Sequence, residues 1–283
     1  MTKWLINGAR TPSLSADDRG LAYGDGVFET LAVRAGQVRF ADAHFARLAA
    51  GCKRLGIDYP GDTLLATEAA ELLAGQQLAT LKIIVTRGAG KRGYAADSSV
   101  PPTRLLGVSS AVVYPTAFYT EGIRLRWCTT LASENSSLAG VKSLNRLENV
   151  LARSEWSDPD IQEGLLCDAA GNAISGTMSN LFIVSHGELL TPSLERSGIR
   201  GTMRQRVVEL WREAGGVIKE IHLNQAAVNQ ADEIFVTNAL IGLWPVRELS
   251  GKHYAHGLVT RRLLGMLANA GVAECAASGA ADA

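Results

Sequence analysis

Hydrophobic and polar residues follow two periodicities along this chain, and each predicts one kind of element. Apolar residues at helical spacing, among them Phe45, Leu48 and Leu55, predict a helix over 41–55 with Asp42 as its N-cap. Further helices are predicted over 64–73, 145–156, 202–214 and 257–270. Short β-branched and apolar runs predict strands over 4–6, 27–33, 81–86, 105–113, 164–167, 181–184 and 233–237.

Helices and strands are mixed without strict alternation, which predicts an α+β or mixed α/β architecture. The pattern of apolar runs is interrupted at Tyr114-Pro115-Thr116, where the chain has the composition of a linker. We therefore expect an N-terminal α/β domain over 1–113, a linker over 114–122 and a C-terminal α/β domain over 123–283.

Composition narrows the function classes. The chain has 283 residues, of which 47% are hydrophobic, enough for one large core or two smaller ones. Its 28 basic residues balance 28 acidic ones, so charge gives no reason to expect nucleic acid or a membrane surface as partner. With no signal peptide and no spanning apolar run, a cytoplasmic protein is expected. Scattered cysteines argue against a metal site or a disulfide framework: Cys52, Cys128, Cys167 and Cys275.

Lys142 is the first candidate for chemistry. It stands between small and apolar residues, in Val141-Lys142-Ser143-Leu144, just before a predicted helix. Loss of hydration in such surroundings favours the neutral amine, which is the form that condenses with a carbonyl group. An ordinary surface lysine at a helix start fits the same residues.

Two features of the sequence suit a phosphate group. The glycines of Gly198-Ile199-Arg200-Gly201 lead into the predicted helix 202–214, and the backbone N–H groups of a helix's first turn bind phosphate well. Arg47, on the predicted helix 41–55, carries a guanidinium suited to bidentate phosphate contact. A plain glycine turn and a solvated helix arginine remain the alternatives.

A basic, glycine-rich loop follows the predicted strand 81–86. Its glycines allow close approach of the backbone and its cations suit an anionic substrate, in Arg87-Gly88-Ala89-Gly90-Lys91-Arg92-Gly93-Tyr94. No Gly-Lys-Ser/Thr follows, so the loop is not a P-loop, and a flexible basic hairpin is the alternative. The histidines have no spacing that pairs them with a nucleophile, which argues against a Ser-His or Cys-His arrangement.

Taken together and in order, six groups of residues resemble the fold-type-IV pyridoxal phosphate (PLP) enzymes. That family contains branched-chain aminotransferases, D-amino-acid aminotransferases and aminodeoxychorismate lyases. The matches are Asp18-Arg19-Gly20 with Tyr23-Gly24-Asp25-Gly26-Val27-Phe28-Glu29, His44-Phe45-Ala46-Arg47-Leu48, Val141-Lys142-Ser143-Leu144-Asn145-Arg146-Leu147, Ser179-Asn180-Leu181-Phe182, Gly201-Thr202-Met203-Arg204 and Ala231-Asp232-Glu233-Ile234-Phe235. The resemblance spans nearly the whole chain and implies the two-domain fold of the D-amino-acid aminotransferase-like enzymes.

The resemblance implies a role for each candidate residue. Lys142 would bind the PLP cofactor and carry a proton. The phosphate of the cofactor would be held by Arg47, by the backbone amides of Gly201, Thr202 and Met203, and by Asn238 and Ala239.

Three features favour the lyase branch of the family. Thr30, which taken singly would be structural, stands where the lyases carry a threonine that protonates the leaving group. The basic loop keeps Arg92 but has Tyr94 in place of the histidine with which D-amino-acid aminotransferases hold a carboxylate. Arg92 and Tyr94 are therefore the expected substrate contacts. Segment 142–148 is also very close to the lyase segment.

Ser175 departs from the family pattern. Most members place a glutamate there, beside the pyridine nitrogen of the cofactor, where a carboxylate keeps the ring a strong electron sink. A hydroxyl does so less well, which should impair an aminotransferase, whereas a lyase gains from forming an aromatic product. We interpret Ser175 as tolerable in a lyase; a shifted alignment is the alternative.

The resemblance implies PLP-dependent conversion of 4-amino-4-deoxychorismate to 4-aminobenzoate and pyruvate, a step of folate biosynthesis. A D-amino-acid or branched-chain aminotransferase, which would need an oxo-acid partner, is the first alternative. A PLP-binding protein without catalysis is the second, and only Ser175 encourages it. The family also implies a homodimer.

Overall fold

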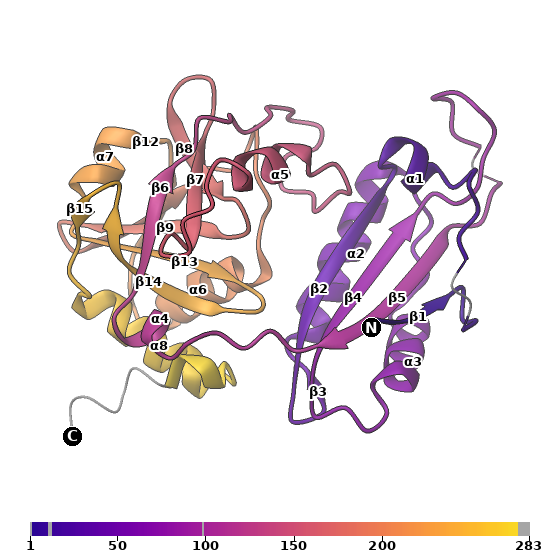
Figure 1. The fold of residues 1–283 in the computed structure, drawn as a ribbon, viewed down its shortest axis with the longest axis horizontal. Coiled ribbons are helices and arrows are strands. Elements are labelled where there is room, and N and C mark those ends of the chain that lie inside the picture. Colours follow the sequence, from indigo (N-terminus) through magenta and orange to yellow (C-terminus); the bar gives the residue numbers. More distant parts are fainter. Residues whose placement is uncertain (1, 11–12, 98, 277–283) are drawn as a thin grey trace. The chain divides into compact units, whose positions relative to one another are not determined.

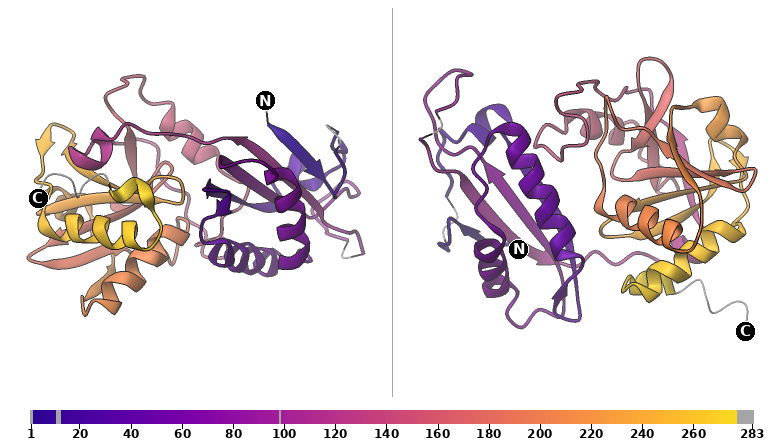
Figure 2. Two further views of the ribbon diagram at one scale, coloured as in Figure 1. Left: turned by 90° about the horizontal axis from the view of Figure 1, so that it is seen from below. Right: turned by 180° about the vertical axis from the view of Figure 1, so that it is seen from behind.

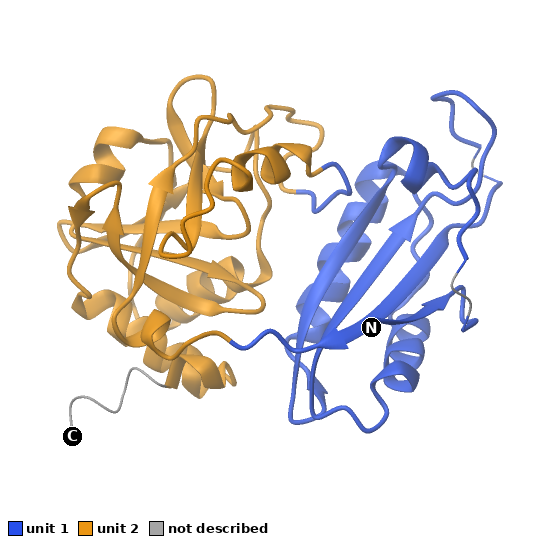
Figure 3. Ribbon diagram, viewed as in Figure 1, with its two compact units in different colours: residues 1–113, 141–145 blue, residues 114–140, 146–283 orange. Residues whose placement is uncertain are grey.

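The chain folds into two compact units, seen in a computed structural model that describes residues 2–10, 13–97 and 99–276 (Figure 3). Unit 1 comprises residues 1–113 and 141–145, and unit 2 comprises 114–140 and 146–283. Helices and strands are mixed in both, which confirms the expected mixed α/β, two-domain fold class. The end of the expected C-terminal domain, 277–283, lies outside the described residues.

Unit 1 is a five-stranded antiparallel sheet with two long helices packed on it (Figures 1 and 2). The strand order is β1-β5-β4-β2-β3. The elements are β1 (Lys3–Ile6), α1 (Arg19–Tyr23), β2 (Gly26–Arg34), β3 (Gln37–Val38), α2 (Ala41–Leu55), α3 (Asp62–Leu73), β4 (Leu78–Thr86) and β5 (Thr103–Ser110).

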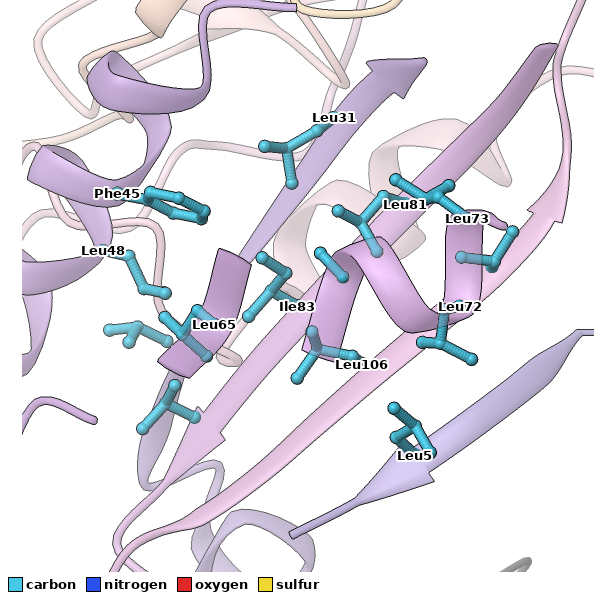
Figure 4. Packing of buried hydrophobic residues seen from close by; sticks show 14 of the residues in the cluster. Leu5, Leu31, Phe45, Leu48, Leu65, Leu72, Leu73, Leu81, Ile83 and Leu106 are labelled. Carbon is cyan, nitrogen blue, oxygen red and sulfur yellow. The ribbon is translucent and has the colours of Figure 1, made fainter. Parts of the chain in front are cut away.

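The core of unit 1 lies between one face of this sheet and the helices α2 and α3 (Figure 4). The packed side chains include Leu31, Leu81, Ile83 and Leu106 from the strands, and Phe45, Leu48, Leu65 and Leu72 from the helices. Because residues of a strand alternate between the two faces of a sheet, Phe28 and Thr30 of β2 point to the face without helices. Thr30 faces Lys82 of β4 in register, so Lys82 shares that face.

The segment that carries Lys142 belongs to unit 1, whereas the sequence predicts it within the C-terminal domain. It runs along the start of β2 and is held there by backbone hydrogen bonds. The Phe28 amide donates to the Lys142 carbonyl at 3.0 Å, and the Leu144 amide donates to the Gly26 carbonyl at 3.0 Å. Backbone pairing of this kind leaves no trace in hydrophobic periodicity, which explains the wrong prediction.

Unit 2 is built on a ten-stranded mixed sheet of order β11-β10-β9-β13-β14-β6-β7-β8-β12, with β15 paired to β14. Helices α6 and α8 pack on each other and against β13. The elements are α4 (Ala117–Thr120), β6 (Ile123–Trp127), α5 (Leu147–Arg153), β7 (Glu163–Cys167), β8 (Asn172–Gly176), β9 (Asn180–Ser185), β10 (Glu188–Pro192), α6 (Thr202–Glu213), β11 (Ile218–Ile221), β12 (Leu223–Asn224), α7 (Gln225–Gln230), β13 (Glu233–Asn238), β14 (Gly242–Leu249), β15 (Lys252–His253) and α8 (Leu258–Asn269).

The predicted linker 114–122 is part of the packed structure of unit 2. Its residues 117–120 form α4, and the rings of Tyr114, Phe118 and Tyr119 meet Trp244 edge-on at 4.7, 5.2 and 6.4 Å. Trp244 of β14 is 1% exposed. The aromatic residues of this segment therefore anchor it, against the prediction made from its proline and polar residues.

Two predicted helix starts also differ from the structure. Phe40 is the N-cap of α2, in the left-handed conformation and without a side-chain cap, while Asp42 lies in the first turn. A carboxylate there still complements the positive end of the helix dipole. The helix predicted over 145–156 is shorter: α5 spans Leu147–Arg153, and the side chain of Asn145, before its start, donates to the Gly24 carbonyl at 3.1 Å. No helix among the described residues is long and apolar enough to cross a membrane.

Candidate active site

Lys142 and Thr30, the two predicted catalytic residues, lie on the same face of the unit 1 sheet. Lys142 is half-buried, and its Nζ lies 4.3 Å from the ring centre of Phe28. Thr30 is also half-buried and follows Phe28 by two residues along β2, so both side chains point to the face without helices. The structure thus places the lysine beside the Phe28 ring and the threonine on the same face of the sheet.

Arg47 pairs with a buried carboxylate on the other face of β2. Its Nε donates to Glu29 Oε1 at 2.7 Å and its Nη2 donates to Glu29 Oε2 at 2.5 Å. Glu29 is 1% exposed, and His44 Nδ1 lies 2.6 Å from the same Oε2. The ion pair holds the guanidinium in one orientation, with its Nε and Nη2 donors directed at Glu29.

The charge states of this cluster follow from burial and hydrogen bonding. Burial raises the pKa of Glu29, but hydrogen bonds from His44 and Arg47 outweigh it and leave the pKa below its ordinary value of 4.5. Burial lowers the pKa of His44 below 6.5, against the opposing pull of Glu29. A neutral His44 therefore donates its Nδ1–H to an ionised Glu29. Glu29 and His44 were missed as site residues, although they lie three residues or fewer from Thr30 and Arg47.

The side chain of Arg87, in the basic loop, forms hydrogen bonds within unit 1. Its Nε donates to Asp25 Oδ2 at 2.7 Å, and its two Nη atoms donate to the carbonyls of Leu55 and Gly56 at 2.6 and 2.7 Å. Burial opposes ionisation of Asp25, but the hydrogen bonds from Arg87 and Arg19 hold its pKa below 3.8. This arginine is therefore structural, whereas the sequence alone groups it with the substrate-binding cations.

Arg19 tethers the part of the loop that carries the predicted substrate contacts. Its Nη1 donates to the Gly93 carbonyl at 2.7 Å and its Nη2 to the Tyr94 carbonyl at 3.3 Å. The Tyr94 ring lies 5.6 Å from that of Tyr23 and is 89% exposed, and Arg92 is exposed as well. The backbone next to both predicted contacts is therefore fixed by the Arg19 side chain, while the side chains of Arg92 and Tyr94 are exposed.

The start of α6 in unit 2 has the features of an anion site. Gly201 is its N-cap, and no side chain caps the first turn. A Cβ at Gly201 would lie 2.1 Å from Asn180 Oδ1, so this position requires glycine. Thr202 and Met203 follow as buried residues of the first turn, where the N–H groups and the dipole favour a phosphate.

Asn238 and Ala239 lie in the same part of unit 2. Thr237, the residue before them on β13, pairs in register with Asn180, which contacts Gly201. Asn238 Oδ1 accepts hydrogen bonds from the amides of Leu240 and Ile241 at 2.9 and 3.0 Å and shapes the turn after β13. Among the described residues, the buried Thr237 hydroxyl has no hydrogen-bond partner, and with the uncapped helix start it fits an additional polar ligand.

Ser175 lies half-buried on β8, opposite Leu166 of β7. Glu163, at the start of β7, is 1% exposed and is committed to the turn that follows β8. It accepts from the amides of Thr177 and Met178 at 2.9 and 3.1 Å and from the Ser179 hydroxyl at 2.8 Å. Glu163 therefore does not supply the carboxylate that the resemblance implies at position 175.

Glu163 was missed by the sequence analysis, because its contacts with the turn after β8 become visible only in the structure. A Cβ at Gly176 would lie 2.6 Å from Glu163 Oε2, so the glycine makes room for the buried carboxylate. Within the described ranges, no group of three or more His, Cys, Asp or Glu side chains is arranged to hold a metal ion.

Comparison with known proteins relates the chain to one group. The sequence pattern described as amino-transferase class IV matches residues 26–249. The aminodeoxychorismate lyase of Vibrio harveyi is 30% identical over 266 residues, covering 93% of this chain and 98% of that protein. The D-alanine aminotransferase of Bacillus licheniformis is 25% identical over 276 residues, covering 93% of this chain and 94% of that protein.

Among solved structures, the crystal structure of 4-amino-4-deoxychorismate lyase from Pseudomonas aeruginosa is similar to this chain with a TM-score of 0.91. The two sequences are 42% identical, and the match covers 94% of this chain and 98% of the other. The similarity to the lyases thus extends over both units.

Proposed function

Since the chain belongs to the class IV aminotransferase family, whose enzymes use PLP, we propose that it is an aminodeoxychorismate lyase. It would convert 4-amino-4-deoxychorismate into 4-aminobenzoate and pyruvate in the cytoplasm. One observation carries the proposal: Lys142 Nζ lies 4.3 Å from the ring centre of Phe28, on the face of the unit 1 sheet to which Thr30 of β2 also points. A lysine base and a hydroxyl acid on one face are what an elimination requires. The 42% identity to the lyase of Pseudomonas aeruginosa supports the same choice.

The residues present fit PLP as a resident cofactor. In unit 1, Lys142 would hold it covalently and Arg47 would bind its phosphate. Within unit 2, the family resemblance assigns phosphate contacts to Gly201, Thr202 and Met203 at the start of α6 and to Asn238 and Ala239, and the place beside the pyridine nitrogen to Ser175. When bound, the cofactor supplies an electron sink for the electrons released by deprotonation.

The chain's own groups would then move two protons. Lys142 Nζ removes the proton from the amine-bearing ring carbon. The bond between the ring and the enolpyruvyl oxygen breaks, and the Thr30 hydroxyl protonates the leaving group, which becomes pyruvate. Loss of the proton and of the enolpyruvyl group leaves the ring aromatic as 4-aminobenzoate. Arg92 and Tyr94 would contact the carboxylates of the substrate.

The decisive experiment is pyruvate release from freshly made 4-amino-4-deoxychorismate, with no amino acid or oxo acid added. Equal amounts of pyruvate and 4-aminobenzoate from the wild-type protein, and neither from Lys142→Ala, are expected. Absence of pyruvate from a protein whose cofactor is still fixed to the lysine by borohydride would refute the lyase and leave the cofactor assignment standing.

A D-amino-acid aminotransferase is the second candidate, supported by the 25% identity to the D-alanine aminotransferase of Bacillus licheniformis. It would also need Lys142, but it would consume D-alanine in a half-reaction without any aminodeoxychorismate. The family likeness further leads us to propose a homodimer, which gel filtration would test: elution as a monomer would refute it.

A further inference from the structure

Segment 91–96 of the basic loop is largely exposed and is held by side chains of the short helix α1. Among the described residues, its hydrogen bonds are formed only with Arg19 and Tyr23. Arg19 donates to the carbonyls of Gly93 and Tyr94, and the Gly93 amide donates to the Tyr23 hydroxyl at 3.1 Å. The conformation of this part of the loop therefore depends on two side chains of another element.

The guanidinium of Arg19 is buried at the centre of these contacts. The side chain is 7% exposed, and its Nε donates to Asp25 Oδ2 at 2.9 Å. Its Cζ lies 4.8 Å from the centre of the Tyr23 ring. Because the donors of a guanidinium lie in one rigid plane, the contact with Asp25 also sets the directions of the two Nη groups. The carboxylate and the ring therefore direct the guanidinium at the loop.

Asp25 has a complete counter-charge without Arg19. Arg87 forms two hydrogen bonds with the same carboxylate, from Nε to Oδ2 at 2.7 Å and from Nη2 to Oδ1 at 3.1 Å. Arg19 adds one bond to Asp25 and gives its other two to the loop. Neutralising the carboxylate therefore does not explain the contacts of Arg19 with the Gly93 and Tyr94 carbonyls.

We propose that Arg19 is a positioning residue for substrate binding, which acts by fixing the backbone that carries Arg92 and Tyr94. The inference rests on the proposed lyase function and adds to it a buried residue that acts through the loop. The side chains of Arg92 and Tyr94 are exposed, so the tethered backbone is what gives them a defined place. A loop arranged in advance loses less conformational entropy when it binds a ligand, and its affinity for that ligand is higher.

The test compares Arg19→Lys with Arg87→Lys, which alters the other arginine of Asp25. Lysine keeps the positive charge in both variants, but its ammonium group cannot replace the fork of guanidinium donors. Arg87→Lys loses contacts with the Leu55 and Gly56 carbonyls and keeps those of the loop. In holoenzyme, Arg19→Lys should raise KM for aminodeoxychorismate about 10- to 100-fold with little change in kcat. The KM of Arg87→Lys should stay within about twofold of the wild type.

Limited proteolysis measures the tether without substrate. Trypsin cleaves after lysine and arginine, and the tethered segment contains Lys91 and Arg92, both exposed. Because cleavage of a folded protein follows the population of locally opened chain, cleavage at these positions should be about tenfold faster in Arg19→Lys than in Arg87→Lys. Tyr23→Phe removes the other side-chain contact of α1 with the loop and should give a smaller increase. If Arg19→Lys does not fold, Tyr23→Phe takes its place in both measurements.

The outcomes separate this inference from the proposed function. If the wild type cleaves aminodeoxychorismate, the inference requires both a higher KM and faster loop cleavage in Arg19→Lys than in Arg87→Lys. Equal values of either quantity in the two variants, or a lower kcat with unchanged KM, would overturn it and leave the lyase standing. If the wild type does not cleave aminodeoxychorismate, the lyase proposal fails and trypsin decides alone. Faster loop cleavage in Arg19→Lys would then support the positioning role, and equal cleavage would refute it.

Discussion

Arg47 and Glu29 are joined by two hydrogen bonds, of 2.7 and 2.5 Å, between a helix and a strand of unit 1. The carboxylate of Glu29 therefore sets the orientation of Arg47, the arginine proposed to bind phosphate. Removing the partner should affect both the fold and the cofactor, because the guanidinium would lose its orientation.

Glu29→Gln should lower the free energy of unfolding by about 3 kcal/mol, since breaking one side of a buried ion pair leaves the other uncompensated. The affinity for PLP should fall as well. Urea denaturation of the apoprotein and cofactor titration measure the two effects. Glu188→Gln is the matched control, because Glu188 pairs with Lys219 at the surface, where such a pair contributes less than about 1 kcal/mol. Equal losses of unfolding free energy in both variants would show that the buried Glu29 pair stabilises the protein no more than the surface pair does.

His44 and Glu29 should make the protein less stable in acid. The pKa of His44 is lowered in the folded state, so below about pH 6.5 the unfolded chain takes up a proton that the folded protein refuses. The pKa of Glu29 is also lowered, so its contribution, complete above about pH 4.5, is lost as the pH falls further. Both effects therefore reduce stability toward low pH, and that of His44 begins first.

His44→Gln keeps an N–H donor for Glu29 and removes the titration. Between about pH 7.5 and pH 5.5 its unfolding free energy should fall less than that of the wild type, by up to about 1.4 kcal/mol per pH unit below 6.5. Urea denaturation at the two pH values measures this, and all other titrating groups cancel in the comparison. An identical fall in both proteins would mean that His44 binds protons equally in the folded and unfolded states, which would contradict a lowered pKa in the fold.

Gly201→Ala should weaken PLP binding at least tenfold, because the new Cβ would lie 2.1 Å from Asn180 Oδ1 and displace the start of α6. The backbone at Gly201, with φ −66° and ψ 142°, accepts alanine, so the clash is the cause of any loss. Gly265→Ala in α8 is the control: nothing lies within 4 Å of its Cβ position, and alanine there should stabilise the helix by up to about 1 kcal/mol. Normal cofactor affinity in Gly201→Ala would remove this turn from the proposed phosphate site.

Thr30→Val should keep the absorbance of the lysine-bound cofactor and lower the rate of pyruvate release by about 100-fold or more. Valine fills the same space on β2, so the sheet is preserved while the hydroxyl is lost. Single-turnover measurements report the chemical step directly. Unchanged turnover would exclude Thr30 as the proton donor.

Ser175→Glu should change the rate of pyruvate release by less than about tenfold, since aromatisation of the ring drives the lyase reaction. The same substitution should speed the half-reaction with D-alanine, which depends more on the cofactor as an electron sink. Stopped-flow absorbance follows both reactions. A large gain in pyruvate release would contradict the interpretation that a hydroxyl is sufficient here.

The sequence predicts elements wherever side-chain periodicity decides the outcome. The helix over 41–55 is predicted with the bounds of α2, because Phe45 and Leu48 face the core at helical spacing. The sequence-based prediction fails where backbone hydrogen bonds or aromatic packing determine the structure. Segment 141–145 pairs with β2 through backbone atoms, and 114–122 is held by rings around Trp244.

The candidate site shows the same division. Lys142 and Thr30 come from motifs and lie on the same face of the unit 1 sheet, although their roles remain predictions. Glu29 and His44 could not be selected from the sequence, because their significance depends on which residues face each other across strands and helices. The residues of the site lie on different faces of the unit 1 sheet. Glu29 contacts His44 on the face covered by the helices, and Lys82 shares the face without helices with Thr30.

The pairing of segment 141–145 with β2 determines how this protein can be divided. The chain leaves unit 1 after residue 113, returns to it for residues 141–145 and leaves again. Lys142 therefore belongs to unit 1, although the sequence on both sides of this segment belongs to unit 2. A fragment ending at residue 113 would have a five-stranded sheet whose Gly26 and Phe28 backbone groups had lost their partners. Exchange of whole units between relatives must therefore carry these five residues with the first unit, and recombination at a single crossover after residue 113 would separate the lysine from the strand that positions it.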